Sequence, residues 1–231
     1  MAGIELFTAP TANGWKVSIA LEECGLDYDT RYVHFANNEQ KTPEFLALNP
    51  NGRIPVIVDN DNQGYVLAES GAILLYLADR EGKLFPLEKN ARFEATQWLM
   101  FQMSAIGPMM GQAMFFQRIA APKGIVQEYA TERYINESRR LLEILNDRLA
   151  EREYVCDDYS MVDIALFPWV RAYRWANVVV EDLTHLTRWL TLVESRDAVQ
   201  KGLAVPTGKP RVYAEGDLEE AARRNSLLYD A

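Results

Sequence analysis

Residues 4–25 read IELFTAPTANGWKVSIALEECG, and the hydrophobic pattern changes within this stretch in a way that predicts the fold. Residues 4–7 are typical of a short strand, and residues 9–14 are typical of a turn. Beyond the turn, apolar side chains are spaced i, i+3, i+4 and i+7, at Val17, Ala20, Leu21 and Cys24. This spacing predicts one face of a helix that ends at Gly25. The chain therefore starts with a strand followed directly by a helix.

Signals of the same two kinds continue as far as residue 82. Pro43 is typical of a first helical position and begins a short second helix. Glu69-Ser70-Gly71 begins a third helix, which continues through Ala78. A turn at residues 60–64 precedes the last of the strands, which are predicted at residues 32–35, 54–58 and 65–68. The resulting order, βαβαββα, is that of a thioredoxin-like domain.

From residue 90 onward the strand signal disappears and helical spacing replaces it. We therefore expect an α+β protein of two domains, with boundaries listed along the chain: a thioredoxin-like domain at residues 1–82, a linker at 83–89, an all-α C-terminal domain at 90–205 and a tail at 206–231. Gly107-Pro108 is expected to break or kink the first helix of the second domain.

Two further signals lie near the end of the chain. Ser160-Met161-Val162-Asp163 resembles a capping box with Asp in the Glu position, which predicts the start of a buried helix. The tail is expected to be irregular and polar, with one short helix near residues 218–224.

The composition is that of an ordinary folded protein with an acidic balance. The 231 residues are 48% hydrophobic and 25% charged, and the formal net charge is −9. This charge argues against non-specific binding to nucleic acid or to an anionic membrane, because both require a basic face. Neither a basic leader nor an apolar run of about 20 residues is visible, so we expect a cytoplasmic protein. The chain has two histidines, His34 and His185, and two cysteines, Cys24 and Cys156. These residues are too scattered along the sequence for a metal site or a C-x-x-C pair.

Thr11-Ala12-Asn13-Gly14 lies between the first strand and the first helical turn. Asn-Gly is also common in β-hairpins, but the residues that follow have a period near 3.6, which favours a helix start. A hydroxyl, a side-chain amide and backbone N–H groups then meet at a helix N-terminus, which is where anions bind.

Two other segments carry polar groups at the start of an element. A cis bond at Ile54-Pro55 would aim the backbone of Ile54 outward for pairing with an extended peptide, whereas a trans bond would make Pro55 an ordinary strand start. Ser70 is either a simple N-cap or, together with Glu69, a holder of a carboxylate and an ammonium. Gln40 and Arg53 add an amide and a cation.

Glutathione offers groups in the order that these segments require. Its thiol would lie near Asn13 and its peptide backbone near Ile54. Its amino-acid end would meet Glu69 and Ser70, and its remaining carboxylate would lie near Gln40 and Arg53.

From about residue 4 to about residue 203 the chain resembles glutathione S-transferases, and specifically the bacterial Nu class, which has disulfide-reductase members and resembles a fungal nitrogen regulator. The Thr-x-Asn-Gly and Gly-Pro-Met-x-Gly-Gln segments are the class-specific ones. The residues that carry the resemblance are Ala9-Pro10-Thr11-Ala12-Asn13-Gly14, Pro43-Glu44-Phe45-Leu46, Gly52-Arg53-Ile54-Pro55, Glu69-Ser70-Gly71-Ala72-Ile73-Leu74-Leu75-Tyr76-Leu77, Gly107-Pro108-Met109-Met110-Gly111-Gln112 and Ser160-Met161-Val162-Asp163-Ile164-Ala165.

This resemblance implies a homodimeric enzyme with glutathione as co-substrate and no metal, in which Thr11 and Asn13 face the glutathione sulfur. It implies that Ile54, beside a cis Pro55, bonds the cysteinyl backbone. The other implied contacts are those of the γ-glutamyl end with Glu69 and Ser70, and of the remaining polar groups with Gln40, Arg53 and Arg133. Many such families have a catalytic Tyr, Ser or Cys where this chain has Ala9-Pro10-Thr11, so we expect no tyrosine mechanism.

Thr11 and Asn13 are sufficient for thiol activation on energetic grounds. Lowering the thiol pKa by about 2 units from a reference near 8.5 requires roughly 2.7 kcal/mol. A helix N-terminus contributes about 0.3–1 kcal/mol, and a hydrogen bond to a charged group about 1.5–3 kcal/mol. The bound thiolate is then expected to reduce disulfides or to attack peroxides and electrophiles, without help from Cys24 or Cys156.

Two questions stay open at this point. One apolar group is either helix core or the wall of a second-substrate pocket, and it consists of Met109, Met110, Met114, Phe115 and Phe116. The protein is either an enzyme that acts on a small electrophilic or disulfide substrate, or a glutathione-binding regulatory protein with little turnover. The presence of both Thr11 and Asn13 favours the enzyme.

Overall fold

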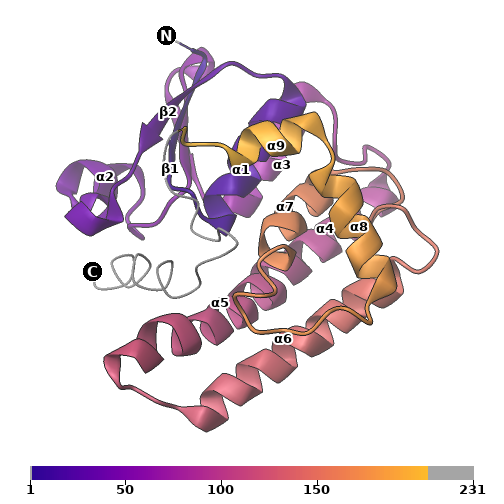
Figure 1. Cartoon of the computed structure of the whole chain (residues 1–231). Helices are drawn as coiled ribbons and strands as arrows, with labels where there is room; N and C mark the ends of the chain where they lie inside the picture. The colour runs from indigo at the N-terminus through magenta and orange to yellow at the C-terminus, as the bar shows by residue number, and fades with distance from the viewer. Residues whose placement is uncertain (1, 208–231) are drawn as a thin grey trace.

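The computed structural model describes residues 2–207, in which a small sheet packs against a larger group of helices (Figure 1). The strands of this part of the chain form one sheet in the order β2-β1-β3-β4. β1 (Ile4–Thr8) is parallel to β2 (Tyr28–Tyr32) and antiparallel to β3 (Val56–Asp59), which is antiparallel to β4 (Tyr65–Ala68). The helices among them are α1 (Ala12–Cys24), α2 (Pro43–Leu48) and α3 (Ser70–Glu81), and short 3₁₀ turns lie at Phe35–Asn37, Glu39–Lys41 and Asn60–Asn62. The predicted βαβαββα order is confirmed.

The second strand is the element that sequence analysis misplaced. It was predicted at residues 32–35, yet β2 spans Tyr28–Tyr32 and pairs with β1 from Ile4 opposite Tyr28. β2 is an edge strand whose residues are exposed or half-buried, so it needs no apolar run. The apolar Val33 that suggested a strand instead packs in a small cluster beside the sheet. Tertiary pairing therefore outweighed local hydrophobicity.

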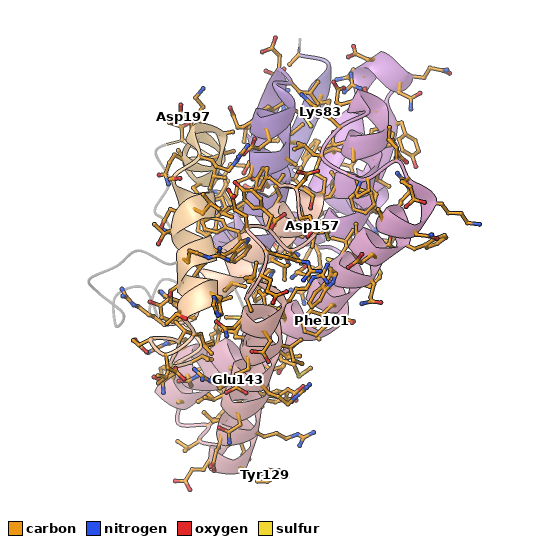
Figure 2. The ribbon with its side chains drawn as sticks, turned by 90° about the vertical axis from the view of Figure 1, so that its right-hand side faces the viewer. Lys83, Phe101, Tyr129, Glu143, Asp157 and Asp197 are labelled. Atoms are coloured by element: carbon orange, nitrogen blue, oxygen red, sulfur yellow. The ribbon has the colours of Figure 1, made fainter. Side chains whose placement is uncertain are left out.

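The helices after the sheet begin at α4 (Lys89–Phe101), directly beyond the segment that we interpreted as a linker. They continue, in chain order, as α5 (Gly107–Phe115), α6 (Glu128–Arg148), α7 (Met161–Val170), α8 (Thr184–Glu194) and α9 (Asp197–Leu203). Among the elements of residues 2–207, α6 is the longest, and Figure 2 shows Tyr129, near its start, at the opposite end of the molecule from Lys83. The fold class predicted from the sequence is thus confirmed.

The helical backbone does not end at Gly107-Pro108. Gln102–Ile106 form a π-helical turn between α4 and α5, and helical dihedral angles continue through Gly107. A π-helical turn is one of the ways in which a helix accommodates a proline, which has no N–H to donate. A second π-helical turn, Phe116–Ala120, and a 3₁₀ turn, Ala121–Lys123, follow α5.

α1 is the centre of the packing. It contacts α3, α7 and α9, and its large buried side chains belong to one cluster that extends from the sheet into the helices. α9 lies beside α1 in Figure 1, although the two helices are far apart in the sequence. Close approach is possible because Gly202 has no Cβ, which would lie 2.6 Å from Ile19 Cα. α1 is therefore held between α3 and two helices from the second half of the chain, α7 and α9.

The capping box at Ser160 is confirmed. The Ser160 hydroxyl accepts from Val162 N–H at 3.3 Å, and Asp163 Oδ2 accepts from Ser160 N–H at 3.0 Å. Asp163 is fully buried, and its Oδ1 also accepts from the Trp189 indole N–H at 2.9 Å. The helix predicted near residues 218–224 lies outside the described residues.

Candidate functional site

A cleft of about 630 Å³ opens where the start of α1, the start of α3, the π-helical turn before α5 and α7 come together. Its lining residues are Asn13, Lys16, Arg53, Glu69, Gln102, Met103, Gly107, Pro108, Gly111, Gln112, Phe115 and Trp169. Of the residues predicted from the sequence, Asn13, Arg53 and Glu69 therefore meet in one cleft. Volumes of this size are typical of small-molecule sites.

The start of α1 is built from a cap and a close contact. Thr11 is the N-cap, and its hydroxyl oxygen accepts from Gly14 N–H at 3.3 Å. Gly14 lies inside the helix, where a Cβ would approach Ala9 O to 2.2 Å and Thr8 Oγ1 to 2.4 Å. The Asn13-Gly14 pair thus lets the helix start against the end of β1, and the hairpin interpretation was correctly rejected.

The orientation of the Asn13 amide is determined by a residue 156 positions away. The Trp169 indole N–H donates to Asn13 Oδ1 at 2.9 Å. Because an indole nitrogen only donates, the atom that faces it is the amide oxygen. The –NH₂ group of Asn13 is then the end of the amide that is available to a ligand in the cleft.

Lys16 is a buried cation in the floor of the cleft. Its side chain is 1% exposed, and burial lowers the pKa of its ammonium to about 7 from the ordinary 10.5, although the nearby charge of Glu69 opposes this shift. The ammonium donates to Gln102 Oε1 at 2.6 Å and to Ser70 Oγ at 3.4 Å, and it lies 3.5 Å from Met103 Sδ. A buried cation with neutral partners favours an anion nearby.

These contacts of Lys16 also orient two donors. Lys16 occupies a lone pair of the Ser70 hydroxyl, which donates its own proton to Met103 Sδ over a long 3.9 Å contact that a better acceptor would replace. Gln102 turns its oxygen to Lys16, and its buried Nε2 has no hydrogen-bond partner within residues 2–207. Such unpaired buried donors are uncommon in folded proteins, and this one lines the cleft. Both donors would suit a carboxylate.

Glu69 is held in an unusual backbone conformation at the same place. It is the N-cap of α3, its side chain lines the cleft, and its φ of 70° lies in the left-handed region. Non-glycine residues with this φ are uncommon and cluster at functional sites. The conformation places an acidic side chain beside the helix start at Ser70.

The loop before β3 brings Arg53 to the cleft. Asn49 Nδ2 donates to Arg53 O at 2.7 Å, and the Ile54-Pro55 peptide is cis, as the resemblance implied. Ile54 is buried directly beside Arg53 and does not line the cleft itself. Gln40 is 4% exposed, and its Oε1 has no partner within the described residues.

Thr11 and Arg133, like Gln40, Ile54 and Ser70, are not among the residues that line the cleft. Thr11 is half-buried at the cap of α1 and is not among the lining residues, although it stands two positions before Asn13. Arg133 is exposed on α6 and lies outside the cleft in the single chain. The roles predicted for both residues stay predictions.

The apolar group after Gly107-Pro108 is divided between core and cleft. Met110 and Met114 are buried in the main cluster, and Met109 packs against it. Phe115 lines the cleft, together with Met103. Phe116 lines a second cavity of about 550 Å³ between the π-helical turn and α6. The core interpretation is therefore confirmed for Met110 and Met114, while a second-substrate role for Phe115 stays a prediction.

The cysteines are poor nucleophiles. Cys24 is buried, and burial raises the pKa of its thiol to about 11. Burial, with the charge of Asp163 next in importance, raises the pKa of Cys156 to about 12. Neither lines the cleft. Among residues 2–207 no group of histidine, cysteine and acidic side chains is arranged to hold a metal ion.

Sequence reasoning missed Lys16, Gln102 and Trp169. Lys16 had a usable signal, because it is three residues after Asn13 and therefore on the same face of the predicted helix. Gln102 and Trp169 come from distant helices and had no such signal.

Within the described part of the chain, no helix is both long and apolar enough to cross a membrane.

Comparison with known proteins places the cleft in context. The model of the family described as "Glutathione S-transferase, N-terminal domain" matches residues 2–79. The chain is 40% identical over 205 residues to the disulfide-bond oxidoreductase YfcG of Escherichia coli (strain K12), a match that covers 87% of this chain and 94% of that protein.

Solved structures are similar over most of the chain. The glutathione transferase of Burkholderia graminis, with two glutathione molecules bound per subunit, has a TM-score of 0.84 and 46% identity over 89% of each chain. The glutathione transferase of Pseudomonas putida, with one glutathione disulfide bound per subunit, has a TM-score of 0.83 and 43% identity. That second match covers 88% of this chain and 91% of the other.

Proposed function

Because the chain belongs to the glutathione S-transferase family, we propose that its cleft binds glutathione and that the protein is an enzyme that uses the bound thiolate. The sulfur would lie at the start of α1, facing the –NH₂ group of Asn13. The single observation that carries this proposal is that the amide of Asn13 is oriented with its donor end available at a helix N-terminus in a cleft. An anion is what such a place stabilises.

The sulfur site needs little more than this arrangement. The Thr11 hydroxyl accepts from Gly14 N–H, so its own proton is available as a second donor. One charge-assisted hydrogen bond contributes about 1.5–3 kcal/mol, enough to lower a thiol pKa by about one to two units. The thiolate is the reactive form of sulfur, and the enzyme's own cysteines are not required.

The γ-glutamyl end would be held at the start of α3. Glu69 lies at the cleft wall, where it would meet the ammonium, while the Ser70 hydroxyl and Gln102 Nε2 would donate to the carboxylate. The Lys16 charge beneath Ser70 and Gln102 supports placing the carboxylate there, because a cation favours an anionic group over a neutral one. Ile54 would bond the cysteinyl backbone. The remaining carboxylate would approach Arg53, with Gln40 and Arg133 as further contacts.

The proposed reaction is the reduction of a disulfide by two glutathiones. The bound thiolate attacks one sulfur of the substrate disulfide, which forms a mixed disulfide and releases the other sulfur as a thiolate that takes up a proton. A second glutathione thiolate attacks the mixed disulfide, which releases the second substrate thiol and leaves glutathione disulfide. The relatives that hold two glutathiones, or one glutathione disulfide, per subunit support this stoichiometry. Peroxides and electrophilic carbons are further targets of the same thiolate.

A second copy of the chain is part of the proposal. Exposed apolar side chains lie on β4 and α4, at Tyr65, Val66, Phe93 and Met100, which we call the β4–α4 face. Contacts with α3 join its two halves: the Tyr65 ring lies 5.5 Å from the Tyr76 ring, and Arg92 pairs with Asp79 at 2.8 Å. A patch of this kind is typical of an interface, and a symmetric dimer buries the same patch on both copies.

The division of the chain and its location belong to the same proposal. Residues 1–82 would form the glutathione-binding domain and residues 90–205 the helical domain, followed by the tail at 206–231. We propose a cytoplasmic location, because that compartment keeps glutathione and other thiols reduced.

Titration calorimetry with reduced and oxidised glutathione, combined with a disulfide-reduction assay, tests the function. We expect binding of both forms and sustained turnover of hydroxyethyl disulfide with glutathione. Binding without turnover of disulfide, hydroperoxide and chlorodinitrobenzene substrates would favour the regulatory alternative. Absence of binding would refute both interpretations.

A further inference from the structure

Trp169 extends from α7 into the cleft and contacts the first turn of α1. Its Nε1 lies 2.9 Å from Asn13 Oδ1, and its ring is half-buried among the lining residues. An indole N–H has no acceptor capacity, so this contact is satisfied by one orientation of the amide and not by the other. Trp169 therefore selects between two amide orientations of nearly equal shape.

The Trp169 ring packs against the two glycines of α5, Gly107 and Gly111. A Cβ at Gly111 would lie 3.5 Å from Trp169 Cη2, so the ring rests almost directly on the helix backbone. A Cβ at Gly107 would lie 3.5 Å from Trp169 Cε2 and 2.9 Å from Gln102 Nε2. A methyl group at residue 111 would just touch the ring, whereas a larger side chain would displace it. The two glycines of the Gly-Pro-Met-x-Gly segment thus leave room for the Trp169 ring, a role that the sequence did not reveal.

We propose that Trp169 is a positioning residue for the sulfur site: its indole N–H holds the Asn13 amide so that the –NH₂ group faces the bound sulfur. This inference rests on the proposed function, in which that sulfur belongs to glutathione. An amide turned the other way would present its oxygen lone pairs to a thiolate and would repel it. The fixed orientation means that the donor is in place before the thiol ionises, so no reorganisation accompanies ionisation.

A substitution at Trp169 does not change which charged residues line the cleft. They are Lys16 on α1, Arg53 in the loop before β3 and Glu69 at the start of α3. A substitution at Trp169 leaves all of them in place. A change in the pKa of the bound thiol between the two proteins then reports on the amide.

The test compares Trp169→Phe, which keeps a ring on Gly111 and removes the N–H donor, with the wild-type enzyme. Thiolate absorbance across a pH titration gives the pKa of bound glutathione. We expect this pKa to rise by about one unit, and kcat/KM for a disulfide to fall about tenfold at neutral pH and to recover at high pH. Affinity for S-methylglutathione, which has no ionisable thiol, should change less than about twofold.

Two controls separate positioning from a structural role. Trp98→Phe, in a ring contact with Phe101 on α4, should leave the thiol pKa unchanged. In an Asn13→Ala background, Trp169→Phe should have no further effect on the thiol pKa, because the group that it orients is gone. Should Trp169→Phe fold poorly, Gly111→Leu displaces the indole by another route and should raise the thiol pKa in the same direction.

The outcomes are distinguishable. The pKa of the bound thiol could be depressed equally in wild type, Trp169→Phe and Gly111→Leu. That result would overturn the role of Trp169 while leaving the proposed function intact. Equal effects of Trp169→Phe with and without Asn13 would overturn it too. A wild-type protein that binds neither glutathione nor S-methylglutathione would remove the proposed function and this inference together.

Discussion

The Lys16 ammonium lies 2.6 Å from Gln102 Oε1, and this contact joins the first helix of the chain to the π-helical turn between α4 and α5. A charge buried so completely, with neutral hydrogen-bond partners and only Glu69 as a nearby opposite charge, is costly unless a further anion comes close. The carboxylate of the γ-glutamyl group would be that anion. Lys16 thereby links the packing of the helices to the selection of the ligand.

We expect Lys16→Met to weaken glutathione binding at least about tenfold, because one hydrogen-bonded charge contributes about 1.5–3 kcal/mol. A glutathione analogue without the γ-glutamyl α-carboxylate should bind wild type and variant alike. Calorimetry with both ligands measures the difference. Lys201→Met, on the exposed side of α9, is the matched control and should bind both ligands like wild type. Equal losses for the two ligands would argue against an electrostatic role.

The pH dependence of binding follows from the same residue. Burial lowers the pKa of Lys16 to about 7 in the free protein, and a bound carboxylate favours its protonated form. The complex therefore holds more protons than the free protein above this pH, and affinity for S-methylglutathione should fall as pH rises through 7. Calorimetry in buffers of different ionisation enthalpy should detect proton uptake on binding. In Lys16→Met the uptake between pH 7 and 8 should be absent; if it persists, another group titrates.

Asn13→Ala tests the donor to the sulfur. We expect the barrier for turnover of hydroxyethyl disulfide to rise by about 1.5–3 kcal/mol, the range for a charge-assisted hydrogen bond. Stopped-flow and steady-state kinetics at neutral pH measure kcat and KM separately. Asn60→Ala, on an exposed turn outside the cleft, is the control and should behave as wild type. Unchanged kinetics in Asn13→Ala would remove the amide from the mechanism.

The dimer is tested on the β4–α4 face. Phe93 is 68% exposed in the single chain, and a charge in its place would be buried unpaired in a dimer. Phe93→Glu should shift the protein from dimer to monomer in sedimentation velocity. Tyr129→Glu is the matched control, since Tyr129 is 79% exposed at the start of α6, at the opposite end of the molecule from Lys83. A monomeric wild type, or a Phe93→Glu variant that stays dimeric, would contradict the proposed interface.

The buried capping box should dominate local stability. Asp163 accepts hydrogen bonds from Trp189, Val155 and Ser160, so Asp163→Ala leaves several buried donors unpaired. Each unpaired donor costs about 1–3 kcal/mol, and we expect the free energy of unfolding to fall by more than about 3 kcal/mol. Denaturant titration measures it. Asp158→Ala, an exposed neighbour, should change stability by less than about 0.5 kcal/mol.

The order of elements was predictable because it depends on local patterns. The change of period after residues 4–7 determined that a strand is followed by a helix, and Ser160 with Asp163 predicted a cap that lies within four residues. The N-terminal position of Asn13 was predictable for the same reason. Local patterns did not determine β2, since an edge strand carries little hydrophobic signal and takes its register from β1.

What the sequence by itself determined, then, is the alternation of strands and helices and the group of polar residues at the start of α1. The tertiary structure decided which of these groups face one another. The Asn13 amide is oriented by a residue 156 positions away, and the Lys16 ammonium is bound by one 86 positions away. Hydrogen bonds over such separations depend on how the helices pack, and the periodicity of any one segment carries no information about its distant partner.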